Sequence, residues 1–163
     1  SNEGLGMSSQ RIVLSTSGVP KMIKKMADDK VKFKLAVSLH SAIDETRTRI
    51  MPFNAKMDLT ELGDSLEYWY DKTKSLVTYE YVVWKGVNDK EEDISALVNF
   101  CKKIPSKVNL IQYNSIDDPN FIQASNETLS KYISLLEKNN ITATIRMSRG
   151  NDIDAACGQL ANK

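Results

Sequence analysis

Val77-Thr78-Tyr79-Glu80-Tyr81-Val82-Val83-Trp84 is the stretch with the strongest strand pattern in the chain. Valine and aromatic residues dominate it, and these residue types are enriched in β-strands. Gly86-Val87-Asn88-Asp89 follows as a turn, and the next segment, 90–103, has apolar residues at helical spacing. These residues are Ile94, Leu97, Val98 and Cys101. A strand, a turn and a helix in this order indicate one unit of an α/β fold.

The same alternation extends in both directions along the chain. Further strands are predicted over 11–16, 33–39, 108–113 and 141–146. Further helices are predicted from Pro20 to about Asp29, from Asp58 as N-cap, and from Ser125 as N-cap to the Asn139-Asn140 stop. The segment 41–54 is predicted to be a polar loop with a short helix over 45–50. Strands that alternate with helices in this way place the chain in the α/β class, with a mostly parallel sheet and right-handed crossovers.

Composition and charge limit the possible partners. The 163 residues are 41% hydrophobic and 26% charged, which suits one domain with a substantial core. The net charge of +1 and the pI near 7.7 argue weakly against a nucleic-acid partner, because such domains usually have a pI above about 9. No apolar run is long enough to span a membrane and no signal peptide is visible, so we expect no membrane partner.

Two cysteines, Cys101 and Cys157, and one histidine, His40, are present. Their number and spacing predict neither a disulfide framework nor a metal site, and favour a reducing, cytoplasmic location. Cys101 is predicted to belong to the core, because it lies on the apolar stripe of its helix. From residue types alone, Cys157 in the tail Asp152–Leu160 is a small, half-buried hydrophobic residue, and Gly158 lets a ligand approach its thiol.

Polar residues close the predicted strands. Ser15 and Ser17, Ser38 and His40, Asn88 and Asp89, and Asn114 all stand at strand ends. In folds of this class ligands bind at the carboxyl ends of the strands. Side chains alternate along a strand, so Ser15 and Ser17 share one face, as do Ser38 and His40, with Thr16 and Leu39 turned away. This pattern predicts a site for a polar ligand at one rim of the sheet.

Three functional interpretations are compatible with these residues. Cys157, His40 and Asp44 form a hydrolase if they meet as nucleophile, base and acid, although no nucleophile motif accompanies them. A freestanding α/β module that binds a nucleotide-like ligand explains the polar rim equally well. His40 also has a purely structural interpretation, as a hydrogen-bonded residue at a strand end. Arg146 and Arg149 are suited either to binding phosphates or to contact with solvent.

A third, enzymatic interpretation comes from a set of motifs in a fixed order, which covers the chain from Arg11 to Leu160. The motifs are Ser15-Thr16-Ser17-Gly18, Ser38-Leu39-His40, Asp44-Glu45-x-Arg47, Ile50-Met51-Pro52, Glu80-Tyr81-Val82, Gly86-Val87-Asn88-Asp89, Val108-Asn109-Leu110-Ile111 and the tail Asp152–Leu160. In this order the set resembles the bacterial radical S-adenosylmethionine enzymes that methylate adenine in 23S ribosomal RNA and in transfer RNA.

The resemblance implies a fold, a site and a reaction. The fold is the C-terminal part of a partial (β/α) barrel of radical S-adenosylmethionine type. Ser15, Ser38, Leu39, His40 and Asn114 match positions that bind S-adenosylmethionine, and Cys157 matches the catalytic cysteine. In the intact enzyme this cysteine accepts a methyl group, and the methyl-cysteine intermediate transfers its carbon to carbon 2 of adenine. A related branch of the family modifies carbon 8, and the residues present fit either branch.

Several features of the family have no counterpart in this sequence. The Cys-x-x-x-Cys-x-x-Cys loop that holds a 4Fe–4S cluster through thiolates is absent, as are the Gly-Glu-Pro segment, the glutamate base and the second cysteine. Ser115 stands where the family usually has proline, and the link Gly18-Val19-Pro20 is short by one residue. We therefore expect these 163 residues to be inactive without the half that holds the cluster.

These expectations divide the chain into three parts. Residues 1–10 are expected to be a tag remnant and leader, residues 11–150 the barrel part, and residues 151–163 the catalytic cysteine tail. The strand over 11–16 is expected to leave an unpaired edge, because a barrel opened at this strand loses its neighbour there. Such an edge favours self-association with a second copy. The tail is expected to be poorly ordered, because its partners are absent.

Overall fold

Five strands form one sheet in the order β1-β2-β3-β4-β5, and every neighbouring pair is parallel. The structure is a computed structural model that describes residues 13–29, 34–114 and 122–149. The strands are β1 (Val13–Thr16), β2 (Lys34–Ser38), β3 (Val77–Val82), β4 (Ser106–Asn114) and β5 (Thr142–Arg149). The predicted α/β class, with parallel strands and alternating helices, is confirmed. The leader, the tail with Cys157, and Ser115 lie outside the described residues.

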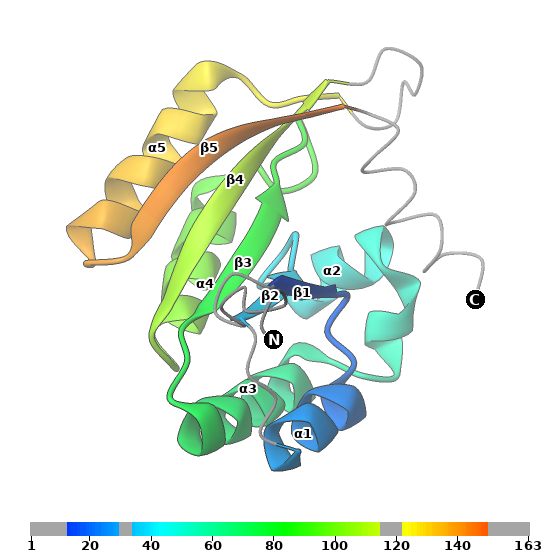
Figure 1. The fold of residues 1–163 in the computed structure, drawn as a ribbon. Helices are drawn as coiled ribbons and strands as arrows, with labels where there is room; N and C mark the ends of the chain where they lie inside the picture. The colour runs from blue at the N-terminus through cyan, green and yellow to red at the C-terminus, as the bar shows by residue number, and fades with distance from the viewer. Residues whose placement is uncertain (1–12, 30–33, 115–121, 150–163) are drawn as a thin grey trace.

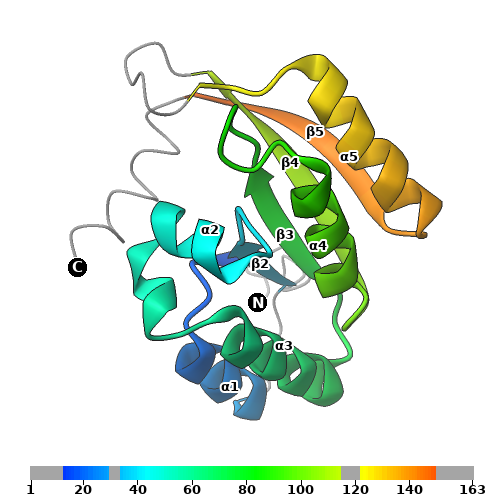
Figure 2. The same cartoon turned by 180° about the vertical axis from the view of Figure 1, so that it is seen from behind.

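The helices α3, α4 and α5 cover one face of the sheet, and α1 packs beside α3 (Figures 1 and 2). The helices are α1 (Pro20–Asp28), α2 (Asp44–Ile50), the 3-10 helix η2 (Pro52–Ala55), α3 (Leu59–Thr73), α4 (Glu91–Cys101) and α5 (Asn126–Lys138). Since α2 and η2 follow β2 directly, they lie at the carboxyl ends of β1 and β2. Among the described residues, the other face of the sheet carries no helix and is the concave face seen in Figure 1.

Local sequence signals set the helix boundaries as predicted. The Asp58 side chain accepts a hydrogen bond from the Glu61 amide at 3.0 Å, and the Ser125 hydroxyl accepts one from the Thr128 amide at 3.2 Å. Each N-cap satisfies an amide that the first helical turn leaves without a partner. Asn140, just after α5, has a φ of 63°, a left-handed conformation that asparagine tolerates well. The Asn139-Asn140 stop is therefore confirmed.

Alternation along the strands gives the sheet an apolar face toward the helices and a mixed face on the opposite side, where Val82 and Ile111 form a second small apolar cluster. Leu35, Val37 and Leu39 point toward the helices together with Val77, Tyr79 and Tyr81, and all are fully buried. From the helices, Ile23, Leu66, Trp69, Leu97 and Leu136 complete this core. Burying a large apolar side chain stabilises a fold by about 1.5–3 kcal/mol, so this layer fixes the strand register. Cys101 is 3% exposed within the same core, as predicted.

The strand predicted over Val77–Trp84 is too long by two residues. β3 ends at Val82, and Trp84 instead forms an isolated antiparallel bridge with Gln123. The amide of Lys85 donates to the carbonyl of Ile122 at 2.6 Å, and the amide of Ala124 donates to the carbonyl of Val83 at 3.1 Å. The pattern of apolar residues did not reveal that β3 ends at Val82, because Val83 and Trp84 remain buried beyond the end of the strand.

Both β1 and β5 lie at the edges of the described sheet. The expectation that the β1 edge pairs with a second copy stays a prediction. Within the described residues, no helix is long and apolar enough to cross a membrane.

Candidate functional site

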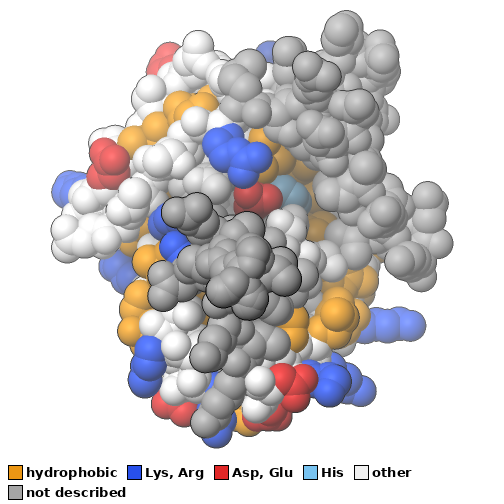
Figure 3. All heavy atoms as spheres, viewed as in Figure 1, with side chains coloured by type: hydrophobic (Ala, Val, Ile, Leu, Met, Phe, Trp, Pro, Cys, Tyr) orange, Lys and Arg blue, Asp and Glu red, His pale blue; other side chains and the backbone are white. Residues whose placement is uncertain are grey.

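The concave face of the sheet carries rows of polar side chains. Ser38, Glu80, Asn109 and Thr144 are register partners on four successive strands. Thr144 Oγ1 lies 2.7 Å from Asn109 Oδ1, and Arg146 Nη1 lies 3.0 Å from Glu80 Oε2. Figure 3 shows acidic, basic and histidine side chains close together on this face. Polar side chains therefore also lie on the concave face before the strand ends, next to the apolar pair Val82 and Ile111.

Ser15 and Ser38 share the concave face, as the alternation predicts. Ser15 pairs with Ala36, which lies two residues before Ser38 on the same face of β2. Ser15 is exposed and Ser38 is half-buried. Within the described part of the chain, neither hydroxyl has a hydrogen-bond partner. No described residue therefore occupies either hydroxyl at this end of the sheet.

Leu39 contributes to this region through its backbone. Its side chain is fully buried in the core on the helix side, so it turns away from the concave face as predicted. The Leu39 amide donates to the Glu80 carbonyl at 2.9 Å. Its carbonyl oxygen accepts from the Ser41 amide at 2.7 Å and from Arg47 Nε at 3.0 Å. The carbonyl of Leu39 therefore belongs to a tight three-residue turn centred on His40.

His40 is 3% exposed and has a φ of 58°, which is rare for a residue other than glycine. Its Nδ1 accepts a hydrogen bond from the Val82 amide at 3.0 Å, and its carbonyl accepts one from Asn88 Nδ2 at 2.8 Å. Burial, and secondly the charge of Arg47, lower the pKa of His40 to about 3. The ring is therefore neutral near pH 7, and its proton is on Nε2 because Nδ1 is an acceptor.

This geometry argues against the hydrolase interpretation. A catalytic histidine uses Nδ1–H to donate to the acid and Nε2 to accept the proton of the nucleophile. In this protein His40 has the opposite tautomer. The proposed acid, Asp44, accepts at Oδ1 from the Leu59 amide at 2.8 Å and from Asn54 Nδ2 at 3.0 Å. His40 and Asp44 thus form no acid–base pair in the described structure.

Arg47 is a residue of this region whose role the sequence did not indicate. It is fully buried on α2 and donates four hydrogen bonds. The acceptors are the carbonyls of Ser17 (3.0 Å), Ser38 (3.2 Å) and Leu39 (3.0 Å), and Asn54 Oδ1 (2.9 Å). Arg47 therefore joins the carboxyl ends of β1 and β2. The only signal was its place in Asp44-Glu45-x-Arg47, a polar segment that was predicted to be mainly loop.

Asn88 was expected at the polar rim, and this expectation is wrong. It is fully buried and makes hydrogen bonds within the protein. Its Oδ1 accepts from the Trp84 amide at 2.7 Å, and its Nδ2 donates to the carbonyls of His40 and Val82, both at 2.8 Å. Tyr132 then donates to the Asn88 carbonyl at 2.5 Å. Asn88 fixes the turn after β3 against the end of β2, so it supports the site rather than facing it.

Of the two remaining predicted site residues, the structure describes only the backbone of Asn114 and nothing of Cys157. Asn114 ends β4, where it is the register partner of Arg149, but its side chain lies outside the described set. Cys157 lies outside the described residues altogether. The structure therefore brings together Ser15, Ser38, Leu39 and His40, and places the end of β4 two strands away from β2.

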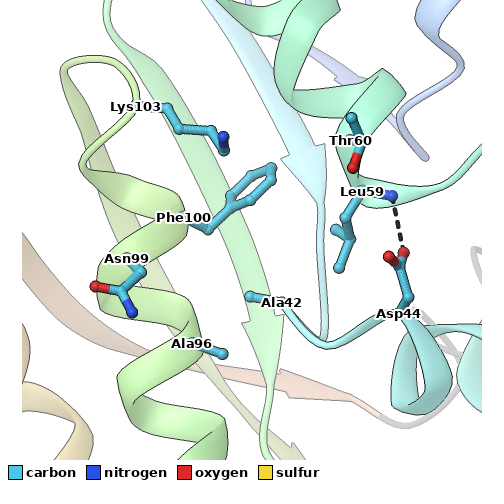
Figure 4. A pocket seen from close by; sticks show the side chains of 8 residues that line it. All are labelled: Ala42, Asp44, Leu59, Thr60, Ala96, Asn99, Phe100 and Lys103. Carbon is cyan, nitrogen blue, oxygen red and sulfur yellow. Dashed lines mark hydrogen bonds between the residues drawn. The ribbon is translucent and has the colours of Figure 1, made fainter.

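A hollow of about 390 Å³ opens elsewhere, on the helix side of the sheet (Figure 4). Its lining residues come from the loop after β2, the first residue of α2, the start of α3, α4 and the segment just after α4. They are Ala42, Asp44, Leu59, Thr60, Ala96, Asn99, Phe100 and Lys103. Asp44, the candidate acid of the hydrolase interpretation, is among them, but none of the predicted S-adenosylmethionine contacts is, so this hollow is separate from the concave rim.

The residues present do not fit an iron–sulfur cluster. In the described part of the chain, no three histidine, cysteine or acidic residues lie close enough together to hold a metal. The whole sequence contains two cysteines, fewer than the thiolates that such a cluster requires. Of these two, Cys101 is buried, and burial raises its pKa to about 12. Cluster ligands would have to come from outside these 163 residues.

Comparison with known proteins relates the whole chain to one group. All 163 residues align with 67% identity to a Flavobacterium psychrophilum protein described as "Probable dual-specificity RNA methyltransferase RlmN". The chain is a relative of the RlmN proteins. A Thermoanaerobacter protein of the same description is 40% identical over 160 residues. The chain spans about half the length of these RlmN relatives, 47% in both cases. No family model matches the chain.

Solved structures agree with this relation to RlmN. A radical SAM methyltransferase from Sphaerobacter thermophilus is 36% identical, with a TM-score of 0.85 over the whole chain and 48% of its own length. A domain of a pyruvate-formate lyase-activating enzyme from Bacteroides vulgatus superposes with a TM-score of 0.61 at 15% identity. It covers 82% of this chain and 80% of that domain, and at this identity it shows the fold alone. The predicted resemblance to the radical S-adenosylmethionine methyltransferases is therefore confirmed.

Proposed function

We propose that this chain is the C-terminal part of a radical S-adenosylmethionine RNA methyltransferase. The complete enzyme methylates carbon 2 of adenine in 23S rRNA and in tRNA, and these 163 residues alone are inactive. The observation that carries the proposal is the match of the entire chain, at 67% identity, to a protein described as an RlmN methyltransferase. We propose that residues 11–150 belong to the barrel part, residues 151–163 to the catalytic cysteine tail, and residues 1–10 to a tag remnant and leader.

We propose that Ser15, Ser38, Leu39, His40 and Asn114 bind S-adenosylmethionine. The hydroxyls of Ser15 and Ser38 have no partner in the described structure, and they lie on the same, concave face of the sheet. His40 is neutral because burial keeps its pKa near 3. A neutral imidazole does not repel the sulfonium charge of this cofactor, and its Nε2–H remains a hydrogen-bond donor.

Cys157 is proposed to accept the methyl group. Its thiolate attacks the methyl carbon of S-adenosylmethionine, a carbon–sulfur bond forms, and the bond to the sulfonium breaks to release a neutral thioether. A 4Fe–4S cluster, held by residues outside this chain, supplies the radical chemistry that activates the methyl group. Thiolate and cluster both need a reducing compartment, so the cytoplasm is the proposed location. The RNA contacts also involve residues outside this chain, since its net charge is only +1.

The decisive experiment uses the full-length protein produced in cells that lack their own adenine-C2 methyltransferase. Mass spectrometry of peptides is expected to find a methyl adduct on Cys157 and none on Cys101. Nucleoside analysis of 23S rRNA and tRNA is expected to find 2-methyladenosine with the wild type and with Cys101→Ser. Cys157→Ser should abolish the modification. Full modification by Cys157→Ser would refute the role of Cys157.

The same assay separates the related possibilities. A product methylated at carbon 8 elutes differently and would assign the protein to the other branch. The chain of 163 residues, produced alone, should yield no methylated adenine. Binding of S-adenosylmethionine by the full-length protein without any RNA methylation would instead support a ligand-binding module with the same concave site.

A further inference from the structure

Arg47 is a buried cation held mainly by main-chain oxygens. Its guanidinium donates to three carbonyls and to one amide side chain, and the ring of Phe53 lies 5.4 Å from it. No ion pair of Arg47 occurs among the described residues. Burial lowers its pKa to about 10, and the charge of Asp44 offsets part of this effect. A buried charge without a bonded carboxylate is costly, so packing alone does not account for an arginine at this position.

The carbonyls that Arg47 binds belong to the turn that carries the predicted cofactor contacts. Ser38 and Leu39 are two of the five proposed binding residues, and Ser17 lies just after β1, two residues beyond Ser15. Gly18 lies directly against the guanidinium, since a Cβ built on Gly18 would be 3.3 Å from Arg47 Nη2. Arg47 thus fixes the ends of both β1 and β2 from one side chain on α2.

A regular parallel ladder would use the Leu39 carbonyl differently. Because the Leu39 amide donates to the Glu80 carbonyl, the next bond of the ladder would run from the Val82 amide to the Leu39 carbonyl. That carbonyl is already shared by Arg47 Nε and the Ser41 amide. The Val82 amide instead donates to His40 Nδ1. The imidazole of His40 has taken the place of a main-chain acceptor.

We infer that Arg47 is a positioning residue that keeps the turn at Ser38–His40 in its ligand-binding form. By holding the Leu39 carbonyl away from β3, Arg47 makes His40 Nδ1 the acceptor for Val82, and this leaves Nε2–H as the donor available to a ligand. Without Arg47 the β2–β3 ladder is free to extend by one bond, and His40 is released from its strained conformation. This inference rests on the proposed binding of S-adenosylmethionine at this turn.

The first part of the test uses nuclear magnetic resonance on the 163-residue chain, whose single histidine makes the imidazole signals unambiguous. A nitrogen–nitrogen coupling across the Val82 N–H···Nδ1 hydrogen bond is expected in the wild type. Arg47→Met should abolish the coupling, and Arg47→Lys, which keeps the charge but not the planar fork, should weaken it. Arg49→Met is the matched control, because Arg49 is exposed on the same helix, and the coupling should persist in it.

A milder variant covers the case in which Arg47→Met does not fold. Asn54→Ala removes the one side-chain acceptor that the guanidinium has among the described residues but leaves Arg47 in place. The coupling in Asn54→Ala should be weaker than in the wild type. A coupling that stays unchanged in both Arg47→Lys and Asn54→Ala would overturn the inference.

The second part measures function in the full-length protein. Arg47→Lys is expected to raise KM for S-adenosylmethionine by about tenfold with little change in kcat, because it disturbs binding and not the reacting atoms. An unchanged KM together with a lost coupling would also overturn the positioning role. The two proposals can fail separately. A wild-type enzyme without affinity for S-adenosylmethionine would refute the proposed function. The nitrogen–nitrogen coupling between Val82 and His40 would still show whether Arg47 positions His40.

Discussion

Glu80 on β3 and Arg146 on β5 form an ion pair across the intervening strand β4, with Arg146 Nη1 3.0 Å from Glu80 Oε2. The side chain of Glu80 is 20% exposed and that of Arg146 is 57% exposed. The pair therefore links an edge strand to the centre of the sheet on the concave face. The Asn109–Thr144 hydrogen bond lies on the same face and joins β4 to β5. Two polar side-chain interactions therefore connect β5 to the neighbouring strands.

For this ion pair we predict a small effect on stability. A double-mutant cycle with Glu80→Gln and Arg146→Met should give a coupling energy of at most about 1 kcal/mol, because exposure lets solvent screen the charges. High salt should reduce the coupling further. Chemical denaturation measures both quantities. A second cycle with Lys131→Met and Glu127→Gln is the control, because the Lys131–Glu127 pair is 4.0 Å long and largely exposed and should give no coupling energy. A coupling of several kcal/mol would show that the concave face is much drier than these exposures indicate.

Two substitutions of His40 should differ strongly in stability. His40→Ala leaves the buried Val82 amide without an acceptor, which costs about 1–3 kcal/mol. In His40→Asn, Oδ1 stands where Nδ1 was and asparagine tolerates the φ of 58°, so stability should stay within about 1 kcal/mol of the wild type. Chemical denaturation compares the two variants. Equal losses of stability in the two variants would mean that the hydrogen bond from the Val82 amide to His40 Nδ1 does not contribute to stability.

The stability of the fold should decrease on acidification because of His40. Burial lowers the folded-state pKa of His40 from 6.5 to about 3, so the unfolded chain binds the proton more readily. This contribution to stability is fully present above pH 6.5 and is lost as the pH falls from 6.5 toward 3. Between pH 7 and pH 5 the free energy of unfolding should decrease by about 2 kcal/mol. In His40→Asn this part of the pH dependence should disappear, and an identical pH profile for the two proteins would contradict the assignment.

Asn88 should be among the least replaceable residues of the chain. Asn88→Ala removes one acceptor and two donated hydrogen bonds in a fully buried place, and we expect a loss of about 3 kcal/mol or more. Asn88→Asp should be no better, because a carboxylate accepts from the Trp84 amide but cannot donate to the two carbonyls. Thermal denaturation measures both variants. Asn99→Ala, an exposed change on α4, serves as the control and should leave the melting temperature nearly unchanged.

Cys101 should be unreactive in the folded protein. It is 3% exposed, and burial raises its pKa to about 12, so the thiolate fraction near pH 8 is very small. Treatment with iodoacetamide at pH 8 should leave the Cys101 peptide unlabelled until denaturant is added, as peptide mass spectrometry will show. Rapid labelling of Cys101 without denaturant would mean that α4 opens readily.

Local chemistry made much of the fold predictable from the sequence. Asp58 and Ser125 were recognised as N-caps because a capping side chain needs only its neighbours along the chain. The alternation of apolar residues likewise gave the two faces of β2 and placed Ser38 on the concave side. These features depend on residues within one or two turns of each other, which a sequence displays directly.

The contacts that shape the site could not be predicted in the same way. Arg47 binds the carbonyl of Ser17, which lies 30 residues earlier, and a bond to a carbonyl depends on the path of the backbone and not on the identity of Ser17. The alternation rule also stops at His40, whose φ of 58° breaks the extended conformation. Asn88 was assigned to the rim because polar residues at strand ends commonly face ligands. In the structure its side-chain amide instead donates to the Val82 carbonyl and stabilises the turn after β3.

The way in which Arg47 is held has a consequence for how this protein tolerates mutation. Because the guanidinium binds main-chain oxygens, the half-buried side chain at position 17 can change without weakening this contact, whereas Leu39 is also held by its place in the core. The arginine itself has no such latitude, since no other side chain offers the same fork of donors. A saturation library of this region should therefore show that position 47 on α2 tolerates no replacement, while position 17, just after β1, accepts many.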